Sequence, residues 1–165
     1  MVKKKVCLLG PFCVGKTSLI RKYIFNIYSE KYLSTVGVKI DKKTVTLKTG
    51  EEVMLMLWDL EGKEASESVT ETYLRGMSGF ILVADGTRPD TLVCVQKILN
   101  KMKNLFPGVP CILLINKFDL KDQWTVKKED FSAFTSEGID VSFTSAKDGT
   151  GVEEAFLKIT EIMTR

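Results

Sequence analysis

Residues 10–17, GPFCVGKT, place two glycines, a lysine and a threonine at the spacing G-x-x-x-x-G-K-T. The glycines allow the backbone to turn its N–H groups toward an anion, and Lys16 adds a positive charge for the outer phosphates. The hydroxyl of Thr17 is a hard oxygen ligand suited to Mg²⁺. An apolar run at 6–10 precedes the segment, and an amphipathic stretch at 17–25 follows it. This strand–loop–helix context predicts a phosphate-binding loop.

The motifs NKFD at 116–119 and TSAK at 144–147 indicate which base accompanies the phosphates. The two carboxylate oxygens of Asp119 match the N1–H and exocyclic amino donors of guanine, whereas adenine has no such donor pair. Asn116 can tie neighbouring loops together, and the backbone N–H of Ala146 can reach the base oxygen. The two motifs therefore favour guanine and disfavour a P-loop ATPase or kinase.

The segment WDLEG at 58–62 ends an apolar run with a carboxylate, and a glycine follows. At the carboxyl end of a strand, Asp59 can hold Mg²⁺ through a water molecule. The N–H of Gly62 can turn toward a terminal phosphate. The D-x-x-G spacing is a weak pattern by itself, and it gains meaning from its place at the end of a predicted strand.

Short apolar runs alternate with amphipathic stretches along the chain. Strands are predicted at 6–10, as two strands around a turn at 48–51 within 38–59, and at 80–85, 111–116 and 139–145. Helices are predicted at 17–25, from 90 or 91 to 105, and at 152–162. This alternation is typical of a mostly parallel sheet covered on both faces, which binds ligands at the carboxyl ends of its strands. The loops that carry the motifs are therefore expected at one edge of the sheet.

Composition narrows the possible classes of function. A chain of 165 residues fits one domain, and 24 basic and 21 acidic residues leave a net charge of +3, which does not indicate nucleic-acid binding. Because histidine is absent, histidine bases and histidine metal ligands are excluded. No apolar stretch approaches the ~20 residues of a membrane span, the last residues carry no lipidation cysteine, and the four cysteines show no C-x-x-C spacing. We expect a cytoplasmic protein with no direct membrane anchor in this chain, which a partner could recruit to a membrane.

In this order and spacing, GPFCVGKT, Thr35 of STVG, WDLEG, NKFD and TSAK resemble the motifs of the Ras superfamily of small GTPases, over essentially the whole chain. The resemblance implies a P-loop NTPase fold of the α/β class, with three α/β/α layers, a six-stranded mostly parallel sheet containing one antiparallel strand, and five helices. It implies a single G domain over residues 1–165, with the P-loop at 10–17, switch I at about 28–38 and switch II at about 59–75. It also implies GTP or GDP as ligand, Mg²⁺ as cofactor, and effectors and exchange or activating factors as partners at the switch regions.

The resemblance also assigns site residues. Thr17 and Thr35 would ligate Mg²⁺ directly, and Asp59 would do so through water. Tyr28 would lie against the guanine, where the family usually has phenylalanine, and Tyr32 would cover the phosphates. The residues expected to act in hydrolysis are Lys16, Thr35, Gly62 and Lys63. The expected nucleotide-binding residues are Phe12, Cys13, Val14, Gly15, Lys16, Thr17, Ser18, Tyr28, Tyr32, Thr35, Gly62, Asn116, Lys117, Asp119, Ser145, Ala146 and Lys147.

Three residues near the expected γ-phosphate depart from the family pattern. Lys63 stands where the family usually has the glutamine that orients the attacking water, and a lysine has three donors but no acceptor. Phe12 replaces a residue that is commonly small, and Glu61 replaces an alanine or glycine. Each side chain has two open orientations, toward the phosphate site or away from it. We expect GTP hydrolysis to be slow.

Two functions follow from these residues. The first is a guanine-nucleotide switch with slow GTPase chemistry, which signals to partners through switch I and switch II. The second is a GTP-binding interaction module with weak or no turnover, because the binding motifs are kept while the water-orienting residue is replaced. The chain could also be the G domain of a larger protein.

Overall fold

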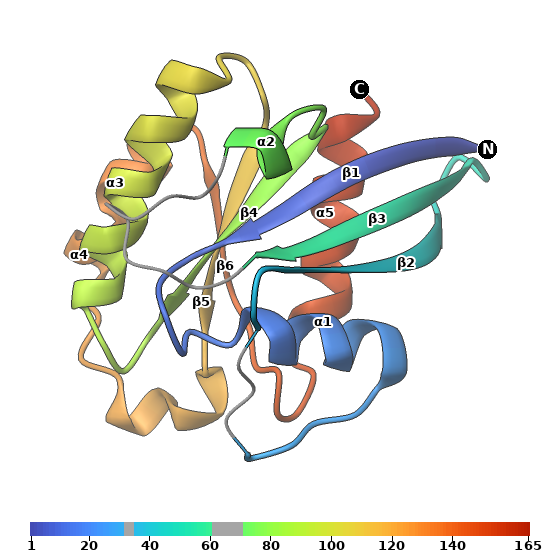
Figure 1. Ribbon diagram of the computed structural model, residues 1–165. Helices are drawn as coiled ribbons and strands as arrows, with labels where there is room; N and C mark the ends of the chain where they lie inside the picture. Colours follow the sequence, from blue (N-terminus) through green and yellow to red (C-terminus); the bar gives the residue numbers. More distant parts are fainter. Residues whose placement is uncertain (32–34, 61–70) are drawn as a thin grey trace.

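The computed structural model describes residues 1–31, 35–60 and 71–165 (Figure 1). The described strands are β1 (Val2–Leu9), β2 (Val38–Thr46), β3 (Glu52–Leu60), β4 (Gly79–Asp85), β5 (Cys111–Asn116) and β6 (Asp140–Phe143). The described helices are α1 (Lys16–Phe25), α2 (Glu71–Leu74), α3 (Asp90–Leu105), α4 (Lys128–Ser136) and α5 (Val152–Met163), with a 3-10 helix at Phe118–Gln123. None of these helices is long and apolar enough to cross a membrane.

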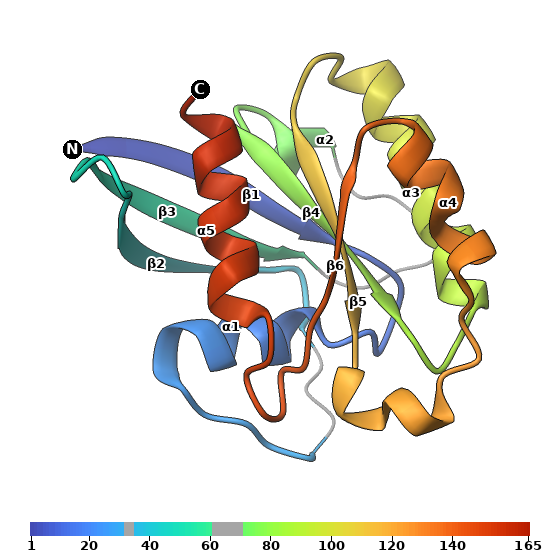
Figure 2. The ribbon, with the colours of Figure 1, turned by 180° about the vertical axis from the view of Figure 1, so that it is seen from behind.

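The six strands form one sheet in the order β2-β3-β1-β4-β5-β6. β2 runs antiparallel to β3, and all other neighbouring strands are parallel. Helices α1 and α5 cover one face of the sheet, and α3 and α4 cover the other, as the two opposite views show (Figures 1 and 2). This arrangement confirms the predicted three-layer α/β fold.

Two hydrophobic cores lie on either side of the sheet, and β1 contributes to both. Val6 and Leu8 are buried among residues of α1 and α5, whereas Cys7 and Leu9 are buried among residues of α3. Successive side chains of a strand point to opposite faces, so a strand covered on both faces reads as a continuous apolar run. This is the physical reason why the central strands could be recognised in the sequence.

Several elements differ from the sequence-based expectation. The apolar periodicity does not predict α2, and β6 spans Asp140–Phe143 rather than 139–145. β1 begins at Val2 rather than at residue 6, because its lysine-rich first half also pairs with β3, with Val2 opposite Val53 and Lys5 opposite Met56. The apolar periodicity does not predict α4, because Phe134 is the one fully buried residue of that helix. A helix with a single buried position has almost no apolar stripe to recognise.

The register of the sheet places the candidate motifs beside one another. The segment GPFCVGKT follows β1, and Leu8 near the end of β1 lies opposite Asp59 of β3. At the end of β4, Asp85 lies opposite Asn116, the last residue of β5. Parallel pairing therefore gathers the strand exits at one edge, which is where such sheets bind ligands.

Gly86, the residue after β4, packs against an aromatic side chain. A Cβ atom at Gly86 would lie 2.0 Å from a ring atom of Trp124, which is closer than any stable contact. The indole N–H of Trp124 donates to the backbone oxygen of Lys117 at 2.8 Å. The glycine therefore allows Trp124 to reach the loop that carries NKFD.

We expect Gly86→Ala to destabilise the protein by about 1–3 kcal/mol, because the added methyl group must displace the Trp124 ring. For a domain of this size, each kcal/mol lowers the unfolding midpoint by about 2–4 °C, which a thermal scan followed by circular dichroism would detect. The control is the double variant Gly86→Ala/Trp124→Leu, in which the added methyl group should cost much less than it does beside the tryptophan. A wild-type midpoint for the single variant would contradict this packing argument.

Candidate nucleotide-binding site

Lys16 is held inside the loop that follows β1. Its side chain is buried, and its ammonium donates to the backbone oxygens of Gly10 at 2.9 Å and Pro11 at 3.3 Å. Burial lowers the pKa of Lys16 to about 8, although the Asp59 carboxylate opposes this shift. The ammonium is thus partly desolvated and bonded to neutral carbonyls of its own loop. A phosphate would offer it a charged acceptor, which makes a stronger hydrogen bond.

The two motif glycines are required by close approach. A Cβ atom at Gly10 would lie 2.4 Å from the backbone oxygen of Val83 in β4. At Gly15, which has φ +102°, it would lie 2.4 Å from the amide nitrogen of Asn116. The loop therefore packs both against the sheet and against the NKFD loop, and no residue with a side chain fits either position without a shift.

The other predicted residues of this loop differ in their exposure. Val14 is buried, Cys13 and Ser18 are half-buried, and the ring of Phe12 is 54% exposed. Cys13 has φ +63°, which a non-glycine residue adopts only in special turns. Phe12 thus presents its ring at the surface of the loop, while its backbone oxygen accepts a hydrogen bond from Arg88.

Three oxygen-bearing side chains converge beside Lys16. The hydroxyl of Thr17 lies 2.6 Å from that of Thr35 and donates to Oδ2 of Asp59 at 2.5 Å. The Thr35 hydroxyl donates to the same Oδ2 at 3.1 Å. Thr35, in the segment predicted as switch I, thereby contacts Thr17 of the P-loop and Asp59 of β3, and these are the three residues expected to hold the metal.

This cluster fits a hard divalent cation. Asp59 is 1% exposed, and its Oδ1 atom has no hydrogen-bond partner within the described part of the chain. Burial raises the pKa of the Asp59 carboxyl, against the hydrogen bonds from Thr17 and Thr35 and the charge of Lys16. A buried carboxylate with an unpaired oxygen beside two hydroxyls is a set of oxygen ligands of the kind that Mg²⁺ prefers.

Asn116 connects three loops. It is 2% exposed, and its amide nitrogen donates to the backbone oxygen of Val14 at 3.0 Å. Its amide oxygen accepts from the Thr144 hydroxyl at 3.1 Å and from the backbone N–H of Ala146 at 3.3 Å. One side chain thus holds the phosphate loop, the NKFD loop and the TSAK loop together, as the sequence suggested for this residue.

The carboxylate of Asp119 is oriented by the TSAK loop. The Ser145 hydroxyl donates to Oδ1 of Asp119 at 2.8 Å, and it also accepts from the backbone N–H of Asp148 at 3.1 Å. Asp119 itself is exposed, so its acceptor oxygens are accessible to a base. Ser145 therefore orients the carboxylate that is predicted to recognise guanine.

Tyr28 and Lys147 lie at the same end of the site. Lys147 forms an ion pair with Glu30 at 2.9 Å. Burial, Asp119 and Glu30 raise the pKa of the Tyr28 phenol, while Lys147 opposes them. The tyrosine therefore lies within electrostatic range of the two base loops, which carry the NKFD and TSAK motifs. The start of the segment predicted as switch I thus lies beside the predicted base site.

Lys117 takes part in contacts that the sequence did not indicate. Its φ of +72° is left-handed, and its ammonium forms an ion pair with Asp85 at 2.8 Å. Trp124 donates to its backbone oxygen. No motif includes Asp85, Arg88 or Trp124. The one feature of the sequence that could have indicated a role for Asp85 is that it ends an apolar run, as Asp59 does.

Four residues named in the sequence-based predictions, Tyr32, Glu61, Gly62 and Lys63, lie outside the described residues. Their roles and orientations remain predictions. Among the described site residues, the structure gathers those of the P-loop, Thr35, Asp59 and the two base loops at one edge of the sheet.

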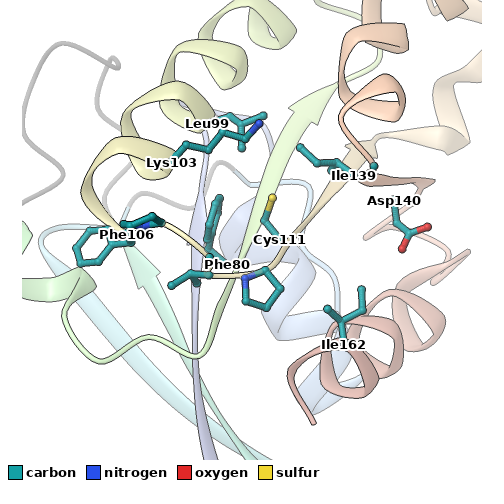
Figure 3. A pocket seen from close by; sticks show the side chains of 13 residues that line it. Phe80, Leu99, Lys103, Phe106, Cys111, Ile139, Asp140 and Ile162 are labelled. Atoms are coloured by element: carbon teal, nitrogen blue, oxygen red, sulfur yellow. The ribbon is translucent and has the colours of Figure 1, made fainter. Parts of the chain in front are cut away.

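A pocket of about 410 Å³ lies elsewhere in the molecule (Figure 3). It is formed where β4, β5 and β6 begin, whereas the candidate site lies where the parallel strands end. Burial raises the pKa of the Cys111 thiol in this pocket to about 11, so the thiol is protonated at neutral pH. The labelled residues that line it are Phe80, Leu99, Lys103, Phe106, Cys111, Ile139, Asp140 and Ile162. The pocket is therefore separate from the candidate nucleotide site.

A glycine-rich loop between the first strand and first helix of a mostly parallel sheet, with Asn116 joining it to the base loops, defines the class of P-loop nucleotide-binding proteins. Comparison with known families places the chain within this class: the model of the Ras family matches residues 5–165. The chain belongs to the Ras family of small GTPases.

Individual relatives agree with this assignment. The chain is 36% identical to Ras-related protein RABD2c of Arabidopsis thaliana over 158 residues, which cover 94% of this chain and 78% of that protein. It is 35% identical to GTP-binding protein ypt1 of Schizosaccharomyces pombe over 159 residues, covering 94% and 77%. It is 36% identical to Ras-related protein Rab-13 of Canis lupus familiaris over 154 residues, covering 92% and 75%.

Proposed function

We propose that the chain is a single G domain that binds GTP or GDP with Mg²⁺, hydrolyses GTP slowly and signals to protein partners through switch I and switch II. The observation that carries the proposal is the set of contacts around Asn116, which joins the phosphate loop to both base loops. A ligand that spans these loops must carry phosphates at one end and a base at the other.

Each group has a role in binding. Lys16 would leave the loop carbonyls and neutralise phosphate oxygens, and Asp119, oriented by Ser145, would accept the two N–H donors of guanine. Thr17 and Thr35 would hold Mg²⁺ directly, and Asp59 through water. When bound, Mg²⁺ neutralises charge on the phosphate oxygens and so favours both binding and phosphoryl transfer.

The contact between Thr35, Thr17 and Asp59 supports the switch proposal. Thr35 belongs to switch I, yet its hydroxyl lies within hydrogen-bond distance of a P-loop hydroxyl and a β3 carboxylate. A metal bound at this cluster would hold switch I against the P-loop. Loss of the terminal phosphate would weaken that hold, because order in such segments depends on contacts of the γ-phosphate and its metal.

Slow hydrolysis is proposed because Lys63 occupies the position of the water-orienting glutamine. A lysine ammonium cannot accept a hydrogen bond from the attacking water. We expect Lys63→Gln to raise the single-turnover rate of GTP hydrolysis by about 10- to 100-fold, which lies at or below the lower end of the roughly 10²- to 10⁴-fold that a positioned acid or base contributes. The measurement is release of phosphate from protein preloaded with GTP, started by adding Mg²⁺.

The matched control is Lys97→Gln, the same change at an exposed position of α3, which should leave the rate unchanged. Equal rates for Lys63→Gln and the wild type would show that another residue limits the reaction. Rapid hydrolysis by the wild type would contradict the slow-GTPase proposal.

The second candidate function is a GTP-binding interaction module without turnover. The lysine at position 63, in place of the water-orienting glutamine, favours this function as well. Chromatography of the nucleotide released from purified protein separates the two functions. GDP as the main product after incubation with GTP and Mg²⁺ supports the switch, whereas GTP that persists unchanged supports the module.

A further inference from the structure

Asp85, the last residue of β4, is a buried carboxylate that the predicted motifs do not include. It is 1% exposed. Its Oδ1 atom accepts from the backbone N–H and hydroxyl of Thr87 at 2.8 and 2.7 Å. Its Oδ2 atom contacts two cations, the Nε of Arg88 at 3.1 Å and the ammonium of Lys117 at 2.8 Å.

The carboxylate is ionised in this environment. Burial by itself raises the pKa of Asp85, but hydrogen bonds from Lys117 and Thr87 outweigh it and hold the pKa below its usual value. A buried charge is tolerated in a protein when it is paired and hydrogen-bonded. Asp85 meets both conditions, and so it can serve as a fixed anchor for the two cations.

Arg88 also contacts the phosphate loop. While its Nε bonds Asp85, its Nη2 donates to the backbone oxygen of Phe12 at 2.8 Å. The Nε and Nη2 donors lie on one edge of a planar guanidinium, so a single rigid group joins the carboxylate to the loop. A lysine has one terminal nitrogen and cannot reproduce both contacts in this geometry.

Together these contacts form a continuous connection from Lys117 of the NKFD loop, through Asp85 and Arg88, to Phe12 of the P-loop. The connection is independent of the one that Asn116 makes with Val14, because the two share no atom. It reaches the P-loop at a different residue, two positions before Val14. The P-loop is thus tied to the base loop at two points.

We propose that Arg88 is a positioning residue that holds the P-loop at Phe12 relative to the base loop and thereby slows the dissociation of guanine nucleotide. The proposal rests on the proposed function, since it concerns nucleotide bound at the same site. Arg88 acts through the backbone of Phe12. Its side chain is 38% exposed, and Lys117 remains as a partner for Asp85 when Arg88 is removed, so truncation leaves no unpaired buried charge.

The test measures dissociation of fluorescent N-methylanthraniloyl-GDP, chased by excess GDP in the presence of Mg²⁺. We expect Arg88→Ala to raise the dissociation rate by about 10- to 100-fold, the value of one hydrogen bond from a charged group. Arg88→Lys should also raise the rate, while its unfolding midpoint stays near that of the wild type. Lys97→Ala, which removes an exposed charge from α3, is the control and should dissociate at the wild-type rate.

A double-mutant cycle with Asp85→Asn distinguishes positioning from general loss of structure, because the amide removes the anchor without leaving a buried charge unpaired. If the connection runs through Asp85, Arg88→Ala should have a smaller effect on the rate in the Asp85→Asn background than in the wild type. Equal fold-changes in the two backgrounds would overturn the proposed connection, and so would wild-type dissociation rates for both Arg88 variants. Failure of the wild-type chain to bind the labelled GDP would instead overturn the proposed function, and this inference with it.

Discussion

Asp119→Asn is expected to lower the affinity for GDP by about 10²- to 10³-fold and to raise the affinity for xanthosine diphosphate. In the proposed complex the carboxylate would accept two N–H donors of guanine, and each hydrogen bond to a charged group contributes about 1.5–3 kcal/mol. An amide in its place keeps one acceptor and turns a donor toward the guanine amino group, which is also a donor. Xanthine carries a carbonyl oxygen at that position, so the amide regains a hydrogen bond.

The measurement is displacement of labelled GDP by each unlabelled diphosphate. The Ser145 hydroxyl can still donate to the amide oxygen, so the loop geometry should be preserved in the variant. Asp122→Asn is the matched control, because Asp122 is exposed and lies on the same 3-10 helix. An unchanged preference for guanine in the Asp119 variant would show that this carboxylate does not read the base.

Nucleotide affinity is expected to be nearly constant below pH 8 and to fall as the pH rises further. In the protein without nucleotide, burial lowers the pKa of Lys16 to about 8, whereas a bound phosphate would raise it. Above pH 8 the free lysine therefore loses its proton, and binding must restore it. By linkage, affinity then declines by up to about tenfold for each pH unit.

Lys16→Met is the control for this pH dependence. It should lower the affinity at neutral pH by about 10- to 100-fold, because a charge-assisted contact to phosphate is lost. Guanine also loses a proton in the alkaline range, which lowers the affinity of both proteins. The variant should therefore keep the decrease in affinity caused by guanine and lose the decrease caused by Lys16. Titrations with labelled GDP between pH 7 and pH 9.5 give both profiles, and parallel profiles for wild type and variant would contradict the assignment to Lys16.

Some residues of the candidate nucleotide site can be recognised from the sequence, whereas others can be identified only by their contacts in the folded protein. GPFCVGKT, NKFD and TSAK are continuous segments in which the residue types and their spacing follow from the local chemistry of phosphates and a base. The central strands were equally recognisable, because burial on both faces leaves an apolar run. Helix α4 was not, since it buries one residue fully.

The candidate metal-binding residues belong partly to each of these two groups. The sequence predicted Thr17, Thr35 and Asp59 as a set through the family resemblance, and the separate residue types were suited to a hard cation. Their convergence depends on the parallel pairing of β1 with β3, which places Asp59 opposite Leu8 beside the P-loop. The unpaired Oδ1 atom of Asp59 is a property of this packing and has no counterpart in the motif.

By itself, the sequence determined the family, the α/β class, and the residues predicted to bind phosphate and base, because each of these depends on short segments with local rules. Only the tertiary structure decided that Asp85, Arg88 and Trp124 support that site. They contact Lys117 and Phe12 across as many as 76 positions of the chain, and the Arg88 contact ends on a backbone oxygen, which every residue type carries. Contacts of this kind leave no local spacing pattern, so only the folded arrangement reveals them.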